Sequence, residues 1–404
     1  MKWARRVGIA LGVVAGLLVV WMAAGAIVYS PEYVFRTLKS RESSVDDYLN
    51  NFPLRELTAS DTPFSFSGAG SPDARAQLEL AFGTSDMTAF LSETQTQALI
   101  VIKDDTIVYE GYANGSDRDA MATSFSVAKS IDSLLVGIAI DEGFIAGVGD
   151  PITDYLPELS ERDPDFEQIT IRDLLLMASG LDYQEFRWWL FNGDDPLTTY
   201  YPDQREISLE NIEIVDAPGQ YFLYNKYHPQ LLGMILERAT GMSVTEYTQT
   251  RLWDRIGMEY DGAWALDSEE SGFEKMEAGL NARPIDFAKF GRLFLNDGVW
   301  EGEQVVSPQW VDESTSLDPT THNADYYSHA WGPFVYDGGG GYYKYMWYGW
   351  LRDGQPADIM AEGDHGQFIY ISPANNVIIV RNGDGFGLTS EEWIDAFYQL
   401  AGEL

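Results

Sequence analysis

The sequence contains no cysteine, only four histidines and few basic residues. Without cysteine, disulfide bonds, thiolate catalysis and cysteine-ligated metal sites are excluded. The histidines form no closely spaced pair of the HExxH type, so no metal is implied; they are His228, His322, His329 and His365. The 26 Lys and Arg residues stand against 63 Asp and Glu residues, giving a net charge of −37. Such a surface repels nucleic acid, which we therefore do not expect as a partner.

One long segment lacks charge, residues 7–28, and Lys2, Arg5 and Arg6 precede it. At 1.5 Å per residue it spans about 33 Å, enough to cross a bilayer core. The basic flank predicts a cytoplasmic N-terminus, with the rest of the chain outside the cytoplasm. We expect a membrane anchor that leaves the chain on the periplasmic side of the inner membrane. The alternative is a cleaved signal peptide and a secreted protein, because Ala24-Gly25-Ala26 fits a cleavage site.

The whole chain of 404 residues, 45% of them hydrophobic, is long enough for a large core. We expect an anchor or signal segment at 1–29, an extended lead-in at 30–84 and one catalytic domain at 85–404. Within the lead-in, residues 60–75 are rich in Ser, Gly, Pro and Asp, which is typical of a loop.

Strand patterns occur at both ends of the main segment, and helical patterns lie between them. The strands are expected as two hairpins, 97–103 with 106–112 and 368–371 with 377–381. Helices are expected at 125–141, 171–178, 229–240, 243–255, 284–296 and 390–401. The predicted fold is α+β: an antiparallel sheet built from both termini, flanked by helices, with an inserted, mainly helical lobe. A site is expected where the lobes meet.

Ser126-Val127-Ala128-Lys129 opens the helix expected at 125–141. Residues three apart share one face of a helix, so Ser126 and Lys129 project together from its first turn. A serine hydroxyl needs a nearby base to become a good nucleophile. A lysine can be that base when burial favours its neutral form. Taken alone, the pair is equally well explained by a solvated lysine and an N-terminal serine.

Two further segments carry candidate functional groups. Tyr224 lies in the loop 218–226 before an apolar helix, where a tyrosine between cations could shuttle protons; alone, it is equally a packing residue. The segment 363–367, Gly-Asp-His-Gly-Gln, precedes a strand, and its glycines would let a substrate approach the backbone. A backbone N–H there could pair with that of Ser126 as an oxyanion hole.

The three motifs, in this order and at these separations, resemble those of the serine β-lactamase-like superfamily. The branch with the greatest resemblance contains class C β-lactamases, carboxylesterases and 6-aminohexanoate-dimer hydrolases. The resemblance covers roughly residues 85–400. Further blocks that carry it are residues 123–130, 150–157, 169–181, 218–233 and 286–293.

The resemblance implies roles for individual residues. Ser126 would be the acylated nucleophile, Lys129 its base and Tyr224 the proton shuttle to the leaving group. The backbone N–H groups of Ser126 and Gln367 would form the oxyanion hole. No organic cofactor is implied, and the substrate would be a small amide or ester.

Two departures from the family pattern concern the substrate pocket, for which Lys226, Asp364, His365 and Gly366 are candidates. Lys226 stands where the family usually has Asn, and Asp364 stands where it often has Lys or His. We expect Lys226 and Asp364 to pair across the cleft; the alternative is that Lys226 points to solvent and Asp364 caps a turn. The departures put broad β-lactam hydrolysis in doubt.

The aromatic stretches 186–189 and 342–350 are candidates for an apolar pocket lining, although such residues are more often core. The sequence thus predicts a serine hydrolase, an esterase or amidase, that acts through an acyl-enzyme. The rival functions are a cell-wall D-Ala peptidase or transferase of the same fold, and a catalytically silent binding or sensor protein. Nothing in the sequence predicts the oligomeric state.

Overall fold

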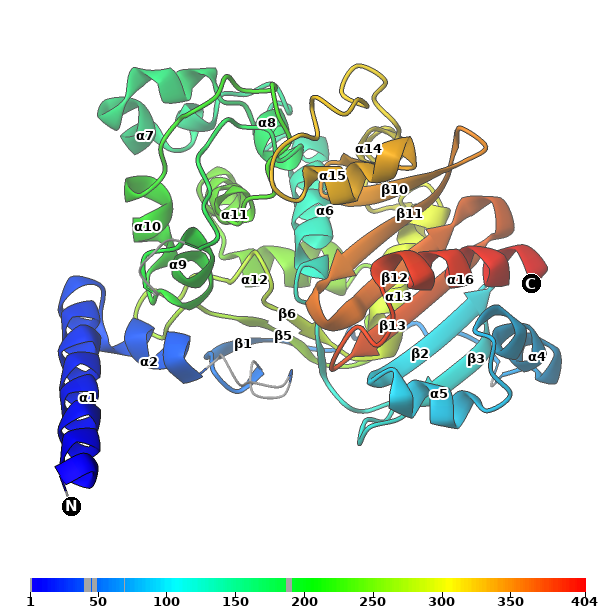
Figure 1. Cartoon of the computed structure of the whole chain (residues 1–404). Helices are drawn as coiled ribbons and strands as arrows, with labels where there is room; N and C mark the ends of the chain where they lie inside the picture. Colours follow the sequence, from blue (N-terminus) through cyan, green and yellow to red (C-terminus); the bar gives the residue numbers. More distant parts are fainter. Residues whose placement is uncertain (1, 40–44, 46–48, 69, 187–190) are drawn as a thin grey trace.

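The main architectural element is a seven-stranded antiparallel sheet with strand order β3-β2-β13-β12-β11-β10-β9 (Figure 1). The computed structural model describes the chain except residues 1, 40–44, 46–48, 69 and 187–190. The two expected hairpins are confirmed and lie side by side, because β13 pairs with β2 from Val377 opposite Lys103 onward. The strands are β2 Thr96–Lys103, β3 Thr106–Tyr112, β9 Gly341–Lys344, β10 Trp347–Arg352, β11 Gln355–Gly363, β12 Gln367–Ser372 and β13 Val377–Gly383.

Both faces of this sheet are buried, so the inner strands β2, β12 and β13 contain apolar runs. Alternate side chains of β2 point to opposite faces: Leu99 and Val101 join one core cluster, Ile100 and Ile102 the other. Helices α4, α5 and α16 cover the face that carries Leu99 and Val101 (Figure 1). These helices are α4 Pro72–Ala81, α5 Met87–Glu93 and α16 Ser390–Glu403.

The opposite face carries the helical lobe, which the sequence correctly places between the two hairpins (Figure 1). Helix α13 packs on β12 and β13, and α6 runs through the centre of the molecule with almost every side chain buried. The helices of this region are α6 Val127–Asp141, α7 Pro157–Arg162, α8 Ile171–Leu175, α9 Asp194–Tyr200, α10 Gln204–Glu210, α11 Tyr227–Thr240, α12 Val244–Thr248, α13 Pro284–Leu295, α14 Pro308–Thr315 and α15 Gly332–Tyr336.

A second sheet, which the sequence analysis did not predict, has the order β1-β5-β6-β4. Its edge strand β1 comes from the lead-in segment and pairs with β5 from Leu54 opposite Ala265 to Leu57 opposite Gly262. The lead-in is therefore partly built into the domain, and α4 begins at Pro72, inside the segment expected to be a loop. The strands are β1 Leu54–Leu57, β4 Ala122–Thr123, β5 Gly262–Ala265 and β6 Leu280–Ala282; a separate short ribbon pairs β7 Val299–Trp300 with β8 Glu303–Gln304.

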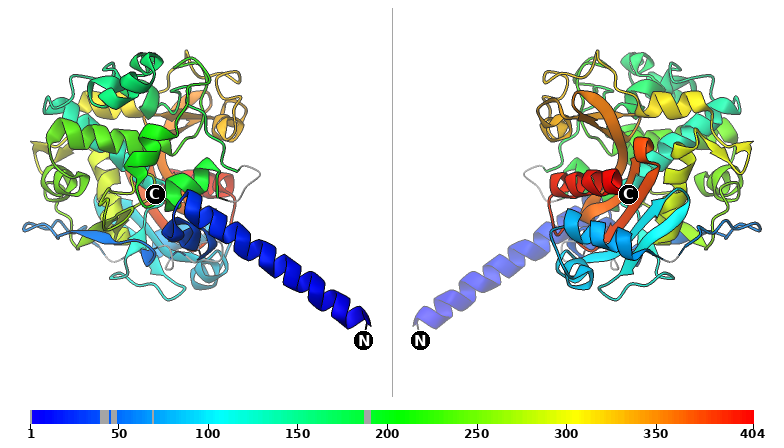
Figure 2. Two further views of the ribbon diagram at one scale, coloured as in Figure 1. Left: turned by 90° about the vertical axis from the view of Figure 1, so that its left-hand side faces the viewer. Right: turned by 90° about the vertical axis from the view of Figure 1, so that its right-hand side faces the viewer.

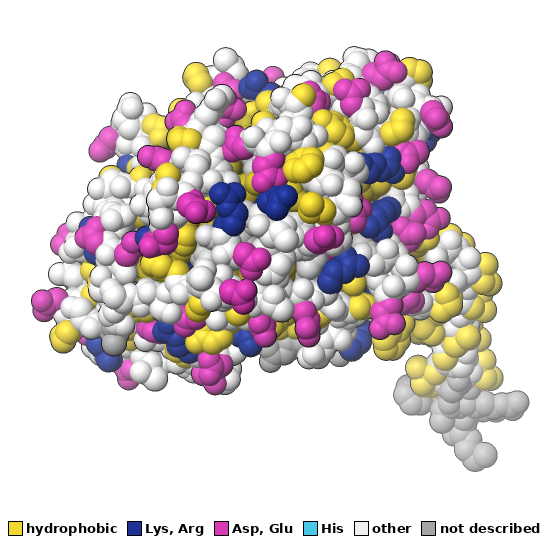
Figure 3. All heavy atoms as spheres, turned by 180° about the vertical axis from the view of Figure 1, so that it is seen from behind, with side chains coloured by type: hydrophobic (Ala, Val, Ile, Leu, Met, Phe, Trp, Pro, Cys, Tyr) yellow, Lys and Arg dark blue, Asp and Glu magenta, His cyan; other side chains and the backbone are white. Residues whose placement is uncertain are grey.

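The N-terminal helix α1 (Lys2–Val28) projects from the body and is followed by α2 (Pro31–Lys39) (Figures 1 and 2). In the described part of the chain, α1 is long and apolar enough to cross a membrane: Leu11–Val28 has a mean hydropathy of 2.4 and is 6% buried. Figure 3 shows apolar side chains gathered along α1, whereas apolar and charged side chains are interspersed on that face of the body. This helix fits either a signal anchor or a signal peptide.

Candidate active site

The turn that carries Ser126 lies between strand β4 and helix α6. Phe125, immediately before Ser126, has a φ of +43°, in the left-handed region that costs energy for any residue with a Cβ. Its ring is held by stacking on His365, with centroids 5.0 Å apart. Such strain persists only where the surrounding structure enforces it, and it is concentrated at functional sites. The strained turn places Ser126 at the start of α6.

Ser126 and Lys129 are hydrogen-bonded, with 2.8 Å between Oγ and Nζ. Lys129 is 1% exposed, and its Nζ also donates to the backbone carbonyl of Glu277 at 2.7 Å. Among the ion pairs of the described residues, none includes Lys129. The amine is therefore buried, oriented by two oxygens and aimed at the serine hydroxyl, as a general base requires.

Asp132 lies one turn further along α6 and is fully buried. Neither of its carboxyl oxygens has a hydrogen-bond partner in the structure. Burial raises the pKa of Asp132 well above its usual value, although nearby Lys129 opposes the shift. Burial thus disfavours the charged form of this carboxyl beside Lys129.

Tyr224 reaches the same place from the loop before α11. The Lys129 Nζ lies 5.1 Å from the centroid of the Tyr224 ring. Burial, followed by the charge and hydrogen-bonding effects of neighbours including Tyr224, raises the pKa of Tyr348 well above its usual value. Among the hydrogen bonds of the described residues, none joins Ser126 directly to Tyr224. Both residues line the same cleft.

A cleft of about 420 Å³ opens above Ser126. This volume suits a small molecule. The lining combines aromatic rings with several carboxyl groups: Phe125, Ser126, Tyr183, Glu185, Asp195, Thr199, Tyr200, Tyr224, Lys226, Glu277, Ala278, Trp331, Phe334, Val335, Tyr348, Glu362, Gly363, Asp364, His365 and Phe386. Burial raises the pKa of Glu362, in this wall, to about 7.

The end of β11 forms the wall next to the nucleophile. A Cβ on Gly363 would come within 3.0 Å of the Ser126 nitrogen and 2.5 Å of the Ser124 carbonyl oxygen. Gln367, the expected second oxyanion donor, pairs with Gly363 across the hairpin but is not part of the cleft lining. Its side chain bonds to the carbonyls of Asp364 and Gly383. Gly363 and Asp364 are thus the hairpin residues that run along the cleft beside Ser126.

The expected pairing of Lys226 with Asp364 is wrong. Lys226 Nζ donates to Asp195 Oδ1 at 2.5 Å and to Thr199 Oγ1 at 3.0 Å, both on α9. Burial opposes the charge on Lys226, but Asp195 and neighbouring groups more than offset it and raise its pKa well above the usual value. Asp364 is exposed and accepts the His365 N–H at 2.8 Å, the turn-capping alternative. A carboxylate closer to Lys226 therefore takes the role expected of Asp364.

The other pocket candidates are placed differently from one another. Lys226, Asp364 and His365 line the cleft, whereas Gly366 does not; a Cβ on Gly366 would lie 2.1 Å from the Arg381 guanidinium. Of the stretch 342–350, Tyr348 lines the cleft. Of the stretch 186–189, Phe186 is 79% exposed and residues 187–189 lie outside the described part of the chain.

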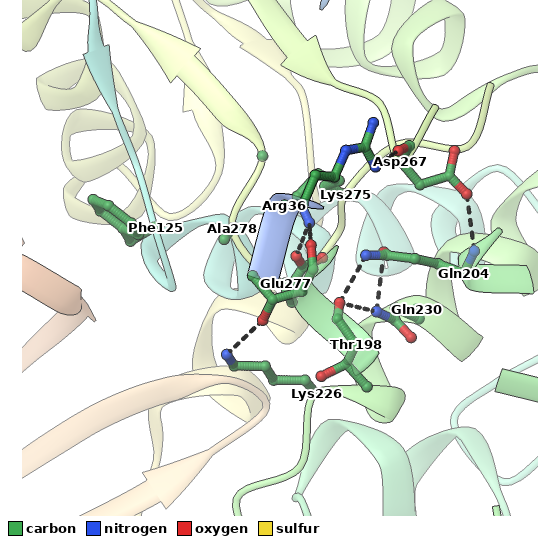
Figure 4. A network of polar contacts seen from close by, with 12 residues as sticks. Arg36, Phe125, Thr198, Gln204, Lys226, Gln230, Asp267, Lys275, Glu277 and Ala278 are labelled. Carbon is green, nitrogen blue, oxygen red and sulfur yellow. Dashed lines mark hydrogen bonds and ion pairs between the residues drawn. The ribbon is translucent and has the colours of Figure 1, made fainter. Parts of the chain in front are cut away.

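A charged network behind the cleft was not predicted from the sequence. Buried Lys275 bonds to Glu277 at 2.5 Å and to the Thr199 carbonyl at 2.6 Å. Figure 4 shows Lys275 between Glu277 and Arg36 of the lead-in. The Lys275 Nζ also lies 4.3 Å from the ring centroid of Phe52, another lead-in residue. These residues support the Glu277 backbone that holds Lys129. Lys275 and Glu277 are two positions apart, but Thr199, Arg36 and Phe52 are distant in sequence, so no local pattern marks the network.

Comparisons with known proteins identify the family of the chain. The sequence profile of the beta-lactamase family matches residues 89–395. The 6-aminohexanoate-dimer hydrolase of Paenarthrobacter ureafaciens is 27% identical over 320 residues, covering 75% of this chain and 76% of that protein.

Two solved structures share the fold. A Bacillus anthracis protein provisionally named a 6-aminohexanoate-dimer hydrolase has a TM-score of 0.68 at 21% identity, covering 86% of this chain and 89% of its own. A class C β-lactamase mutant has a TM-score of 0.59 at 14% identity, covering 82% of this chain and 97% of its own. Since the family profile covers most of the chain, this protein belongs to the beta-lactamase family and is a hydrolase of the serine β-lactamase-like superfamily.

Proposed function

We propose that the protein is a serine hydrolase that cleaves an amide or ester through an acyl-enzyme, with Ser126 as the nucleophile. The observation that carries the proposal is the 2.8 Å hydrogen bond between Ser126 Oγ and a buried Lys129 Nζ that has no carboxylate partner. A silent binding protein has no need of this arrangement. The hydrolase relative and the family membership support the same class of reaction.

In the proposed reaction, Lys129 takes the Ser126 proton while Oγ bonds to the substrate carbonyl carbon. Negative charge develops on the carbonyl oxygen, where the Ser126 N–H and a second backbone N–H stabilise it. We assign the second donor to the cleft-lining end of β11 at Asp364 rather than to Gln367. Tyr224 gives its hydroxyl proton to the departing amine or alcohol as the C–N or C–O bond breaks, and Lys129 returns the Ser126 proton to Tyr224. Water then hydrolyses the ester bond of the acyl-enzyme and releases Ser126.

We also propose that α1 remains as a membrane anchor, with the catalytic domain outside the cytoplasm. Its apolar length and the basic residues that precede it support this assignment.

The test is covalent labelling of the full-length protein by a fluorophosphonate probe, together with turnover of a short water-soluble ester. Ser126→Ala should abolish both, and Lys129→Ala should lower turnover roughly 10²-fold or more, as for a lost general base. Ser133→Ala is the matched control, because this buried serine lies on the same helix and its hydroxyl has no partner. A folded Ser126→Ala variant that still turns over the ester would refute the assignment.

A further inference from the structure

The membrane helix is packed against the body over part of its apolar length. The rings of Trp21 and Phe191 lie 4.6 Å apart, and a Cβ on Gly25 would meet the Phe191 ring at 2.8 Å. Tyr33 on α2 is fully buried, and its hydroxyl donates to the Phe191 carbonyl at 2.7 Å. Residues 21–25 of α1 are thus fixed to the segment that contains Phe191.

This packing determines how deep the body sits relative to a bilayer. Residues 7–20, the apolar part before Trp21, span only about 21 Å, less than a hydrocarbon core of about 30 Å. If α1 crosses the membrane, its last turns, to which Phe191 is attached, must also lie in or at the bilayer. The edge of the domain at Phe191 is therefore held at the membrane surface.

The same segment leads directly to the mouth of the cleft. Its two described ends are joined by hydrogen bonds between Gln184 and Asp194, at 2.9 Å and 2.6 Å. Glu185, next along the chain, lines the cleft and accepts the indole N–H of Trp331. Figure 2 shows α1 leaving the body obliquely.

Exposed apolar side chains gather at this mouth. Phe186, Trp331 and Phe334, here called the rim aromatics, are 79%, 48% and 52% exposed, and the last two line the cleft. On α2, Phe35 is 65% exposed. Exposed aromatic residues next to a membrane helix are typical of the membrane–water interface, where apolar rings enter the headgroup layer.

We propose that the rim aromatics rest on the bilayer that α1 spans, and that the enzyme takes amphiphilic esters or amides directly from that surface. The inference rests on the proposed hydrolase function and on anchoring by α1. The occupant is lipid rather than a protein, because the surface is continuous with the membrane helix. The net charge of −37 favours zwitterionic over anionic headgroups.

Cysteine labelling tests the contact with lipid, because the natural chain contains no cysteine. Full-length Phe186→Cys, carrying a polarity-sensitive fluorophore, is reconstituted in phosphatidylcholine vesicles that contain a spin-labelled lipid. We expect blue-shifted emission and quenching. Leu80→Cys is the control: Leu80 on α4 is 73% exposed, and its label should report water. Emission at position 186 that matches the control overturns the proposal.

Kinetics tests the origin of the substrate. Phe186→Ser should keep wild-type turnover of a short water-soluble ester. Its turnover of a long-chain acyl ester embedded in phosphatidylcholine vesicles should fall about tenfold, because a phenyl ring that is partly buried in the bilayer is removed. Leu80→Ser should change neither rate. Equal rates for Phe186→Ser and wild type on vesicles would refute the membrane proposal and leave the hydrolase intact. A Ser126→Ala variant that keeps both activities would instead refute the proposed function.

Discussion

Lys129 owes its orientation to two oxygens from different parts of the chain, Ser126 Oγ and the Glu277 carbonyl. The carbonyl fixes the direction of one N–H, so the nitrogen points at the serine rather than along the helix. Burial raises the pKa of Asp132 behind it, which disfavours a competing negative charge there. A lysine placed in this way can accept a proton without breaking a salt bridge.

Gly363 gives the sharpest test at the scale of one residue. Gly363→Ala should lower turnover of the soluble ester by at least about tenfold, because the new methyl group would press on the Ser124 carbonyl and the Ser126 N–H. Gly149→Ala is the control, since a Cβ there meets nothing within 4 Å. Rates are compared at matched thermal stability, and a fully active Gly363→Ala variant would contradict the close approach.

The sequence could identify site residues whose contacts are local in sequence, and it missed those whose contacts are distant. The Ser126–Lys129 contact follows from helical spacing alone, so it could be predicted. Lys226 could not be paired correctly, because Asp195 lies 31 positions away on a helix that the sequence analysis did not predict. The Glu277 carbonyl is a backbone group, and no side-chain pattern marks it.

At the scale of elements, the helices and strands with a clear local pattern were predicted, and those without one were missed. The hairpins β2–β3 and β12–β13 and the helices α6, α11, α13 and α16 have strong apolar periods and short turns. The second sheet was missed because β4 and β6 contain only two and three residues, too few to show a period. The stretch 342–350, which forms most of β9 and β10, was considered only as pocket lining or core and not as strands, because its pattern alone does not separate a strand from a core run.

Helix α11 contains a buried histidine that should make stability depend on pH. His228 is 1% exposed and bonds to Ser179 at 2.6 Å, and burial lowers its pKa to about 3. Below pH 6.5 the unfolded chain binds a proton that the folded chain rejects. The free energy of unfolding should therefore fall by about 1.4 kcal/mol per pH unit from pH 6.5 toward pH 3.

Urea unfolding at pH 7, 6 and 5 measures this effect. His228→Gln should be less stable than wild type at pH 7, but the difference should shrink as the pH falls, because the variant lacks the ionisable ring. Ser179→Ala removes the hydrogen bond and keeps the ring, so its curve should stay parallel to that of wild type. A wild-type pH dependence in His228→Gln would show that another group is responsible.

At the scale of the whole molecule, we expect that helix α1 can be removed without loss of the fold, whereas strand β1 of the lead-in cannot. Deletion of residues 1–29 should yield a soluble, folded domain with wild-type turnover of the short ester, since Ser30 is kept to cap Tyr33 on α2. Deletion of residues 1–57 should abolish activity, because it removes β1 from the second sheet and Phe52 from beside Lys275.

Size-exclusion chromatography, circular dichroism and ester turnover distinguish the two truncations. A folded but inactive protein lacking residues 1–29 would mean that α1 itself shapes the cleft. Wild-type activity without residues 1–57 would mean that the lead-in is dispensable.

Because β2 pairs with β13, the sheet can be completed only late in synthesis of the chain. Lys103 and its partner Val377 are about 270 residues apart, so at 5–20 residues per second the hairpin β2–β3 waits for on the order of tens of seconds after leaving the ribosome. During that interval an apolar strand edge lies open to other nascent chains. Only α4 and α5, made just before it, can cover one of its faces meanwhile. Folding of this protein should therefore depend on chaperones that shield the first hairpin until the last strands arrive.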